Sequence, residues 1–344
     1  MQREIRIVGG GLAGLTLGLL LRRDGVPTEV LDAGTYPKPK VCGEFISGKG
    51  VEILKQMDVL APESTVAARQ VRFFDRERSS AAIQLPQTAM AVDRAALDGN
   101  LARAFQREGG MLRENVRWTE SFEGAGLVRA TGRRLTREKS GTMVGIKAHA
   151  RNIPLSADLE LHFADAGYVG LLRQKDGIVN VCALFVRKSA LRNESVAHRD
   201  WPERFAREMG SALRERLHHA TFESTTFASV AGISLQREKA GATRECRIGD
   251  SICMIPPMTG NGMSIALESA TMAAPVLCDY SHGRIEWSQA QREISRRCDQ
   301  AFNRRLAFAR FLQKACLRPA GRRFLLMSTR AMPRSLNAWF WLTR

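Results

Sequence analysis

Three glycines near the N-terminus have the spacing of a phosphate-binding turn. Gly9, Gly11 and Gly14 form the pattern G-x-G-x-x-G directly after a short apolar run, residues 5–8. At the first position only glycine adopts the required backbone angles, the second lets a pyrophosphate approach the chain, and the third lets a helix pack closely on a strand. This spacing predicts a turn that binds a dinucleotide.

The residues around this turn indicate the elements that must position it. The apolar run at 5–8 predicts a strand, residues 15–21 predict a helix, and a second strand ends in Asp32. The helix start offers unpaired N–H groups and a positive dipole end to phosphate, and Asp32 is placed to accept hydrogen bonds from a ribose. A glycine turn without a ligand is the alternative. Further glycines at 18 and 25 and the acidic residue favour the dinucleotide.

A second motif, in the last third of the chain, distinguishes between dinucleotides. A predicted strand leads to Gly249 and Asp250, and residues 256–268 then read PPMTGNGMSIALE. Asp250 is placed to bind a ribityl chain, which FAD has and NAD lacks. Gly260 and Gly262 lie in a rigid loop that opens a helix, whose amides and dipole suit the pyrimidine end of a flavin. We therefore expect FAD as the resident cofactor.

Together the motifs resemble those of the para-hydroxybenzoate hydroxylase superfamily of flavoproteins, and within it the geranylgeranyl reductase-like branch. The resemblance runs from residue 5 to about residue 277 and includes PKVCGEF at 39–45 and DRAALD at 93–98. It implies FAD contacts in both segments. The alternatives without a functional role are that Arg94 is a solvated helix residue, that Cys42 only fills space in the core, and that Asp98 forms a surface ion pair. The cofactor-binding residues expected from the motifs and the resemblance are Gly9, Gly11, Leu12, Ala13, Gly14, Asp32, Ala33, Cys42, Gly43, Arg94, Ala130, Gly249, Asp250, Gly260, Gly262 and Met263.

The middle of the chain is rich in strand signals. Residues 142–149, 167–173 and 177–185 alternate with turn residues, and Lys175-Asp176-Gly177 indicates a hairpin. The resemblance implies that this sheet forms a substrate wall in front of the flavin ring. About half of the polar side chains on such strands would instead meet solvent. The substrate-pocket candidates on these strands are Lys147, His149, Tyr168, Arg173 and Asn180.

Departures from the family leave the reaction open. Ala130-Thr131-Gly132 stands where related hydroxylases have Ala-Asp-Gly, residues 168–173 replace the reductase's aromatic element, and the halogenase tryptophan motif is absent. The leading hypothesis is a monooxygenase that uses FAD, NAD(P)H and oxygen on a small organic or lipid-like substrate. The alternatives are a reductase that saturates carbon–carbon double bonds and a non-catalytic flavoprotein that binds anionic lipid or an acyl carrier protein. No side chain is identified as catalytic.

Composition limits the partners and the compartment. The 344 residues carry a net charge of +17, which favours an anionic partner or substrate, although no nucleic-acid-binding motif accompanies it. Seven scattered cysteines without a C-x-x-C pair favour a reducing cytoplasm and indicate no metal site. We expect no membrane-spanning segment and no nucleic-acid partner. The basic, aromatic residues 318–344 either cap the substrate domain or lie on the inner face of a membrane.

These patterns predict an α/β fold: a Rossmann-like, three-layer ββα FAD-binding domain with an inserted mixed β-sheet and C-terminal helices. The expected organisation is residues 1–75, 93–140 and 236–280 for the FAD-binding domain, 76–92 and 141–235 for the substrate domain, and 281–344 for the helical region.

Overall fold

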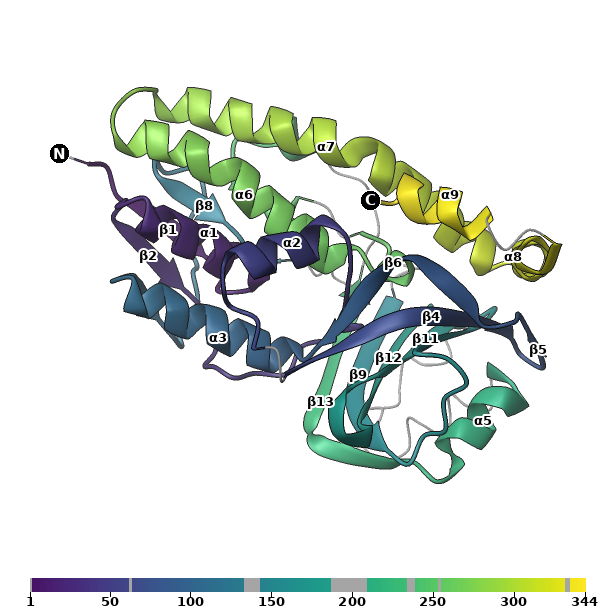
Figure 1. The fold of residues 1–344 in the computed structure, drawn as a ribbon. Coiled ribbons are helices and arrows are strands. Elements are labelled where there is room, and N and C mark those ends of the chain that lie inside the picture. Colours follow the sequence, from purple (N-terminus) through teal and green to yellow (C-terminus); the bar gives the residue numbers. More distant parts are fainter. Residues whose placement is uncertain are drawn as a thin grey trace.

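Two β-sheets joined by helices make up the molecule (Figure 1). The computed structural model describes residues 2–61, 64–132, 143–186, 209–233, 239–252, 255–331 and 335–344. The parallel sheet and its helices lie at the left of Figure 1, near the N-terminus, and the larger sheet lies at the lower right. This arrangement confirms the predicted α/β class with a Rossmann-like sheet, a mixed sheet and C-terminal helices.

The first sheet is wholly parallel and has the strand order β14-β8-β1-β2-β7. β1 is apolar apart from Arg6, and every residue of β2 is buried, as expected for strands covered on both faces. Its strands are β1 (Ile5–Val8), β2 (Thr28–Leu31), β7 (Met111–Arg113), β8 (Leu127–Arg129) and β14 (Cys246–Arg247).

The order of the chain reverses at β1, because β2 pairs on one side of it and β8 on the other. In open parallel sheets, ligands bind beyond the carboxyl ends of the strands at such a switch point. Gly9, Asp32 and Ala130 directly follow the last residues of β1, β2 and β8, respectively. Gly249 lies at the corresponding end of β14. Four distant segments of sequence therefore meet at one edge.

Helices cover this sheet and share its apolar core. Gly18 permits the close approach, since a Cβ there would lie 3.0 Å from the Phe105 ring. In Figure 1, α6 and α7 run beside each other along one side of the molecule, and they pack together. The helices are α1 (Leu12–Arg23), α2 (Lys49–Gln56), α3 (Arg94–Arg107), α6 (Gly262–Ser281) and α7 (Trp287–Cys316).

The second sheet is mixed, with the order β13-β9-β12-β11-β10-β4-β6-β3 and β5 paired with β4. The predicted hairpin joins β11 and β12, with Asp176 at φ 54° in its turn. The small helix α5 (Ser211–His218) packs on the apolar core of this sheet. The strands are β3 (Phe45–Ile46), β4 (Thr65–Asp75), β5 (Arg78–Ser79), β6 (Ile83–Val92), β9 (Met143–Arg151), β10 (Leu159–Ala164), β11 (Gly167–Arg173), β12 (Val179–Val186) and β13 (Thr221–Ile233).

β3 and β4 belong to this second sheet although they lie within residues 1–75, so the chain enters the mixed sheet earlier than the expected organisation has it. The domain boundaries themselves stay a prediction.

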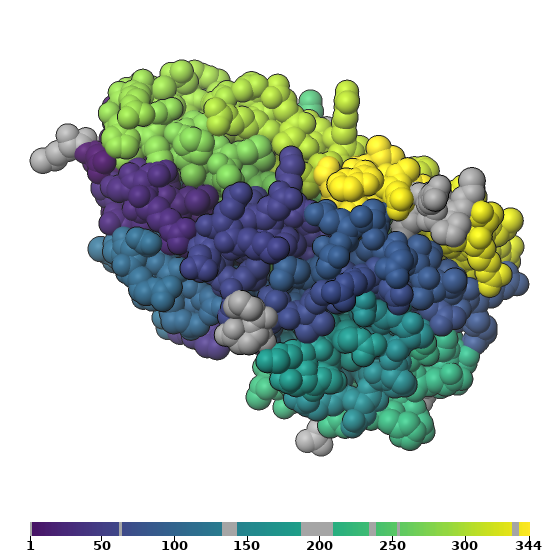
Figure 2. Space-filling view, in the orientation of Figure 1, coloured from purple at the N-terminus to yellow at the C-terminus, as the bar shows by residue number. Residues whose placement is uncertain are grey.

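The chain closes with α8 (Pro319–Ala331) and α9 (Ser335–Leu342). α8 packs on β4 and α9 on β6, so the C-terminal residues, yellow in Figure 2, lie over the strands of the second sheet. Within the described ranges, none of the helices has the length and apolar composition needed to cross a bilayer.

Candidate cofactor and substrate site

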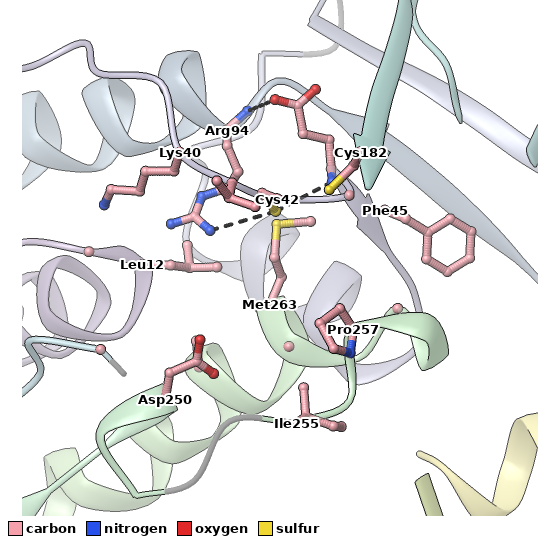
Figure 3. A pocket seen from close by; sticks show the side chains of 18 of the residues that line it. Leu12, Lys40, Cys42, Phe45, Arg94, Cys182, Asp250, Ile255, Pro257 and Met263 are labelled. Carbon is pink, nitrogen blue, oxygen red and sulfur yellow. Dashed lines mark hydrogen bonds between the residues drawn. The ribbon is translucent and has the colours of Figure 1, made fainter. Parts of the chain in front are cut away.

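A cavity of about 800 Å³ lies at the carboxyl edge of the parallel sheet and continues along the second sheet (Figure 3). Most of the expected cofactor-binding residues line it, from both motifs and from the segments between them. In Figure 3 Leu12, Arg94, Asp250 and Met263 surround the same space. The expected residues that line the cavity are Gly9, Gly11, Leu12, Ala13, Asp32, Ala33, Cys42, Gly43, Arg94, Ala130, Asp250, Gly260, Gly262 and Met263.

Gly14 and Gly249 lie behind this lining and set its shape. A Cβ at Gly14 would lie 2.0 Å from the carbonyl oxygen of Gly9, so only glycine lets α1 begin so close to β1. Gly249 has φ +60°, and its Cβ would lie 2.8 Å from that of Ala13. The second motif therefore packs directly against the first. Gly9, at φ +107°, is equally confined, because its Cβ would lie 2.4 Å from the Ala130 oxygen.

Two helix N-termini open into the cavity, and no side chain caps either of them. α1 starts at Leu12 after Gly11, and α6 starts at Gly262 after Asn261. Their first N–H groups and positive dipole ends suit negative charge. At Gly11 a Cβ would meet nothing nearer than the Lys40 ammonium at 3.5 Å, which leaves the backbone open to a phosphate. This cradle fits the pyrophosphate and the flavin ring of FAD at separate helix starts.

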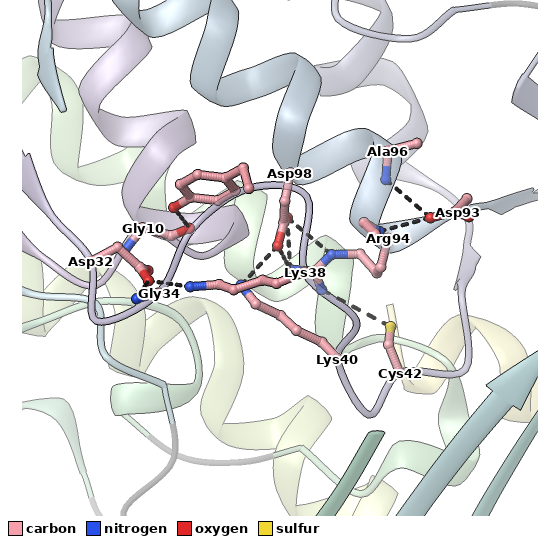
Figure 4. Close-up of polar contacts among 12 residues, drawn as sticks. Gly10, Asp32, Gly34, Lys38, Lys40, Cys42, Asp93, Arg94, Ala96 and Asp98 are labelled. Carbon is pink, nitrogen blue, oxygen red and sulfur yellow. Dashed lines mark hydrogen bonds and ion pairs between the residues drawn. The ribbon is translucent and has the colours of Figure 1, made fainter. Parts of the chain in front are cut away.

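Asp32 lies at the end of β2 as predicted (Figure 4). One carboxylate oxygen accepts a hydrogen bond from the Gly10 N–H at 2.7 Å, and the other accepts from the Gly34 N–H at 2.8 Å. Lys38 forms an ion pair with the same carboxylate. The two backbone bonds fix the orientation of Asp32, and its ion-pair partner Lys38 is partly exposed.

A buried charge cluster supports the segment around Cys42 (Figure 4). Asp98 is fully buried, and Arg94 binds it with N–O distances of 2.9 and 3.1 Å, while Lys40 binds it at 2.7 Å. Burial alone would raise the pKa of Asp98, but these two cations hold it below its ordinary value. The alternative of Asp98 as a surface ion pair is therefore wrong, and Arg94 is not a solvated helix residue.

Cys42 lines the cavity beside Arg94, whose guanidinium lies 4.0 Å from its sulfur. Burial raises the pKa of the Cys42 thiol, with Arg94 opposing and Glu44 adding to the rise. The thiol is therefore protonated near neutral pH and is no thiolate nucleophile. The Glu44 N–H donates to this sulfur, which fixes the bend of the segment.

Glu44 is the centre of a second buried cluster, in which it binds two of the substrate-pocket candidates. Lys147 and His149, two residues apart on β9, lie 3.0 and 2.7 Å from its two carboxylate oxygens. The Gln174 amide donates to Glu44 at 3.0 Å. Glu44 itself has φ 57°, a strained angle for a residue with a side chain, and the contacts hold it there. This cluster joins the cofactor segment to the second sheet.

Of the five substrate-pocket candidates, Tyr168 lines the cavity. Lys147 and His149 instead point to Glu44, Asn180 donates to the Cys42 carbonyl at 3.1 Å, and Arg173 lies at the surface near Asp158. The structure therefore does not bring these four to the cavity wall. Strand alternation alone could not separate the two faces of the sheet.

The part of the cavity beyond the flavin segments is apolar. Strands of the second sheet form one side, and α7, α8 and α9 form the other. Tyr168 is buried in this wall with its ring 6.0 Å from that of Phe163. Burial raises the pKa of Tyr168 well above its ordinary range, so its hydroxyl stays protonated. The apolar residues of this half include Val71, Phe73, Leu159, Leu161, Phe163, Leu172, Leu312, Leu325, Trp339 and Phe340.

Sequence reasoning missed several residues of the site. Lys38 and Lys40 follow the predicted second strand, and their position near Asp32 and Cys42 was a usable signal. Trp339 and Phe340 belong to the segment expected either to cap the substrate domain or to lie on a membrane, but no local pattern placed them at the cavity, which they reach through the packing of α9 on β6.

The comparisons with known proteins agree with this geometry. Residues 2–149 match a family model described as an FAD binding domain. Conditioned medium factor receptor 1 of Dictyostelium discoideum is 28% identical over 144 residues, covering 38% of this chain and 28% of that protein. The chain thus spans under a third of the length of this curated relative.

Solved structures share the fold over nearly the whole chain. The flavin-dependent brominase Bmp2 has a TM-score of 0.79 at 16% identity, covering 99% of this chain and 93% of that one. A geranylgeranyl bacteriochlorophyll reductase-like protein from Thermoplasma acidophilum has a TM-score of 0.72 at 17% identity, covering 96% and 90%. Halogenase PltM in complex with phloroglucinol and FAD has a TM-score of 0.70 at 15% identity, covering 91% and 76%. Residues 2–149 therefore match a family described as an FAD binding domain, and nearly the whole chain shares its fold with these solved structures.

Proposed function

We propose that this protein is an FAD-dependent oxidoreductase that acts on an apolar small molecule, and more specifically a monooxygenase. One observation carries the proposal: a single cavity joins a backbone cradle suited to FAD with an apolar compartment of the second sheet. When bound, FAD supplies the electron transfer. The reaction proposed takes one oxygen atom of O2 into the substrate and the other into water, with two electrons from NAD(P)H.

The chain's own residues would bind the cofactor, orient the substrate and exclude water. The N-termini of α1 and α6 and the carboxylates of Asp32 and Asp250 would hold the cofactor along the cavity. The apolar walls would keep water from the reacting atoms. The protonated Tyr168 hydroxyl would donate a hydrogen bond to a polar atom of the substrate. With a protonated Cys42, we assign no nucleophilic step to the protein.

A reductase that saturates a carbon–carbon double bond is the second candidate. The apolar compartment favours it equally, because such a substrate is hydrocarbon-rich. It would deliver two electrons and two protons to the double bond and would need no oxygen.

Oxygen consumption separates the two enzymes. We would reduce the FAD-loaded protein with NADPH or NADH and measure oxygen uptake with and without isoprenoid and phenolic test compounds. One oxygen consumed per nicotinamide with conversion of the compound supports the monooxygenase. Conversion under strictly anaerobic conditions supports the reductase and contradicts the monooxygenase.

A non-catalytic flavoprotein that binds anionic lipid or an acyl carrier protein is the third candidate, motivated by the short stretch from Asn115 to Leu127 that precedes Ala130. Ser251 ties the backbone just after Thr131 to the second motif, accepting from the Gly132 N–H at 3.0 Å and donating to the Gly132 oxygen at 3.2 Å. This candidate fails if NAD(P)H reduces the bound flavin at a rate that a test compound strongly increases. A cytoplasmic location, with NAD(P)H as a transient donor, completes the proposal.

A further inference from the structure

The outer sides of α8 and α9 carry large apolar side chains in contact with solvent. Phe324 and Met327 on α8 are 64% and 68% exposed, and Trp341 and Leu342 on α9 are 56% and 54% exposed. The Phe324 ring stacks on Trp339 of α9 at 6.2 Å, so the two helices form one surface. We call these four exposed residues the C-terminal face.

The chain segment that carries the C-terminal face has charged residues of one sign. Residues 301–344 contain ten Lys and Arg and no Asp or Glu. Arg305 and Arg322 are buried in ion pairs with acidic residues from elsewhere in the chain. Arg318 and Arg323 are exposed on the same segment as Phe324. Exposed aromatic and aliphatic side chains flanked by arginines are typical of helices that lie in the interface of an anionic bilayer.

The inner sides of the same helices line the apolar half of the cavity. Leu325 follows Phe324 and faces inward, and Trp339 and Phe340 precede Trp341 and also line the cavity. α8 and α9 are therefore the wall between the cavity and the C-terminal face. Among the described residues, α8 and α9 lie between a bilayer at this face and the apolar compartment.

We propose that the C-terminal face docks on an anionic lipid membrane. A second copy of the chain fits less well, because each copy carries a net charge of +17 and the two faces would repel each other. Passage of an apolar substrate from the membrane into the cavity rests on the proposed function, whereas the docking itself does not.

Vesicle binding tests the docking. FAD-loaded protein is sedimented with vesicles of phosphatidylcholine alone or mixed with phosphatidylglycerol, at low and high salt. We expect binding to the mixed vesicles that salt weakens. Arg323→Glu should weaken this binding by more than about fivefold, because it removes one surface cation and adds an anion. Arg107→Glu, an exposed arginine on α3, is the matched control and should bind as wild type.

The apolar contribution needs its own variants. Phe324→Ser with Met327→Ser should weaken vesicle binding by at least about tenfold, since two apolar side chains no longer enter the interface. Met111→Ser, 52% exposed on β7, is the control. Retained flavin and an unchanged melting temperature show that each variant is folded.

Trp341 supplies a second readout. Its fluorescence should shift to the blue when mixed vesicles are added, and Trp341→Phe should remove most of that shift. The proposal is overturned if the protein does not bind anionic vesicles, or if the variants at Arg323, Phe324 and Met327 bind them as well as the control variants do. It is equally overturned if the face variants abolish a dimer in size-exclusion chromatography while vesicle binding is absent.

Discussion

The two halves of the cavity are built by different means. The FAD half consists of glycines, helix starts and carboxylates held by buried charges, with Asp98 and Glu44 both fully buried. The other half consists of apolar side chains from the second sheet and the C-terminal helices. The first can accept only what matches its backbone, whereas the second accepts what is apolar and fits.

Because they are built differently, the two halves should differ in how well they tolerate substitutions. In the FAD half, a change of one backbone atom or one buried charge should cost binding and stability, because no neighbouring group can compensate for it. An apolar wall adapts to volume and fails mainly when a polar group enters it. Substitutions in the first half should therefore remove FAD and stability together, and those in the second should change the bound molecule.

The largest effect is expected at Asp98. Asp98→Asn leaves Arg94 and Lys40 without their buried carboxylate and should lower the free energy of unfolding by about 3 to 5 kcal/mol. Chemical denaturation measures it. Asp279→Asn breaks the 2.8 Å pair with Arg284, in which Asp279 is 45% exposed, and should cost under about 1 kcal/mol. Similar losses in both would show that the buried cluster does not hold the FAD half.

Gly9→Ala tests the backbone cradle. The added Cβ would overlap the Ala130 oxygen at 2.4 Å and force an unfavourable φ of +107°, a strain of about 1 to 3 kcal/mol before the overlap. FAD affinity, measured by flavin fluorescence quenching, should fall by at least about tenfold. Gly25→Ala is the control, because Gly25 has φ +76° but nothing within 4 Å. Unchanged affinity in Gly9→Ala would contradict the cradle.

Leu161→Asp tests the apolar half. A carboxylate in this wall should weaken the binding of an apolar dye such as Nile red by about tenfold, since its charge must be kept hydrated. The content of bound FAD should stay at the wild-type level. Leu161→Met keeps the wall apolar and should bind the dye normally. Loss of flavin together with dye binding would show that the two halves are not independent.

The smallest effect is expected at Tyr168. Tyr168→Phe removes a hydroxyl that has no hydrogen-bond partner among the described residues, so stability should change little. A phenolic ligand that uses this hydroxyl should bind about two- to tenfold more weakly, the loss of one hydrogen bond. Nile red binding should stay the same. Equal affinity for the phenolic ligand would remove Tyr168 from the proposed substrate contacts.

The sequence allowed the FAD half to be predicted well because its requirements are local. Where φ must be +107°, or where a Cβ would lie 2.0 Å from a neighbouring carbonyl oxygen, the residue must be glycine, so the sequence shows glycines at a fixed spacing. The two halves of that site lie some 240 residues apart, yet each motif is complete by itself, and Gly249 meets Ala13 in the fold.

The apolar half could not be predicted in the same way. Lys147 and His149 looked like pocket residues because strands alternate, but the buried Glu44 attracts both of them. Trp339 reaches the cavity only because α9 packs on β6, a contact between residues some 250 positions apart. Such choices depend on tertiary packing and leave no local pattern.

The central claim is that one cavity holds FAD along the carboxyl edge of the parallel sheet. Its most direct test is the absorption spectrum of purified protein after incubation with FAD and removal of the excess. We predict a flavin spectrum with about one FAD per chain, which Gly9→Ala greatly reduces and Gly25→Ala retains. A wild-type protein that holds no flavin after this treatment would contradict the account.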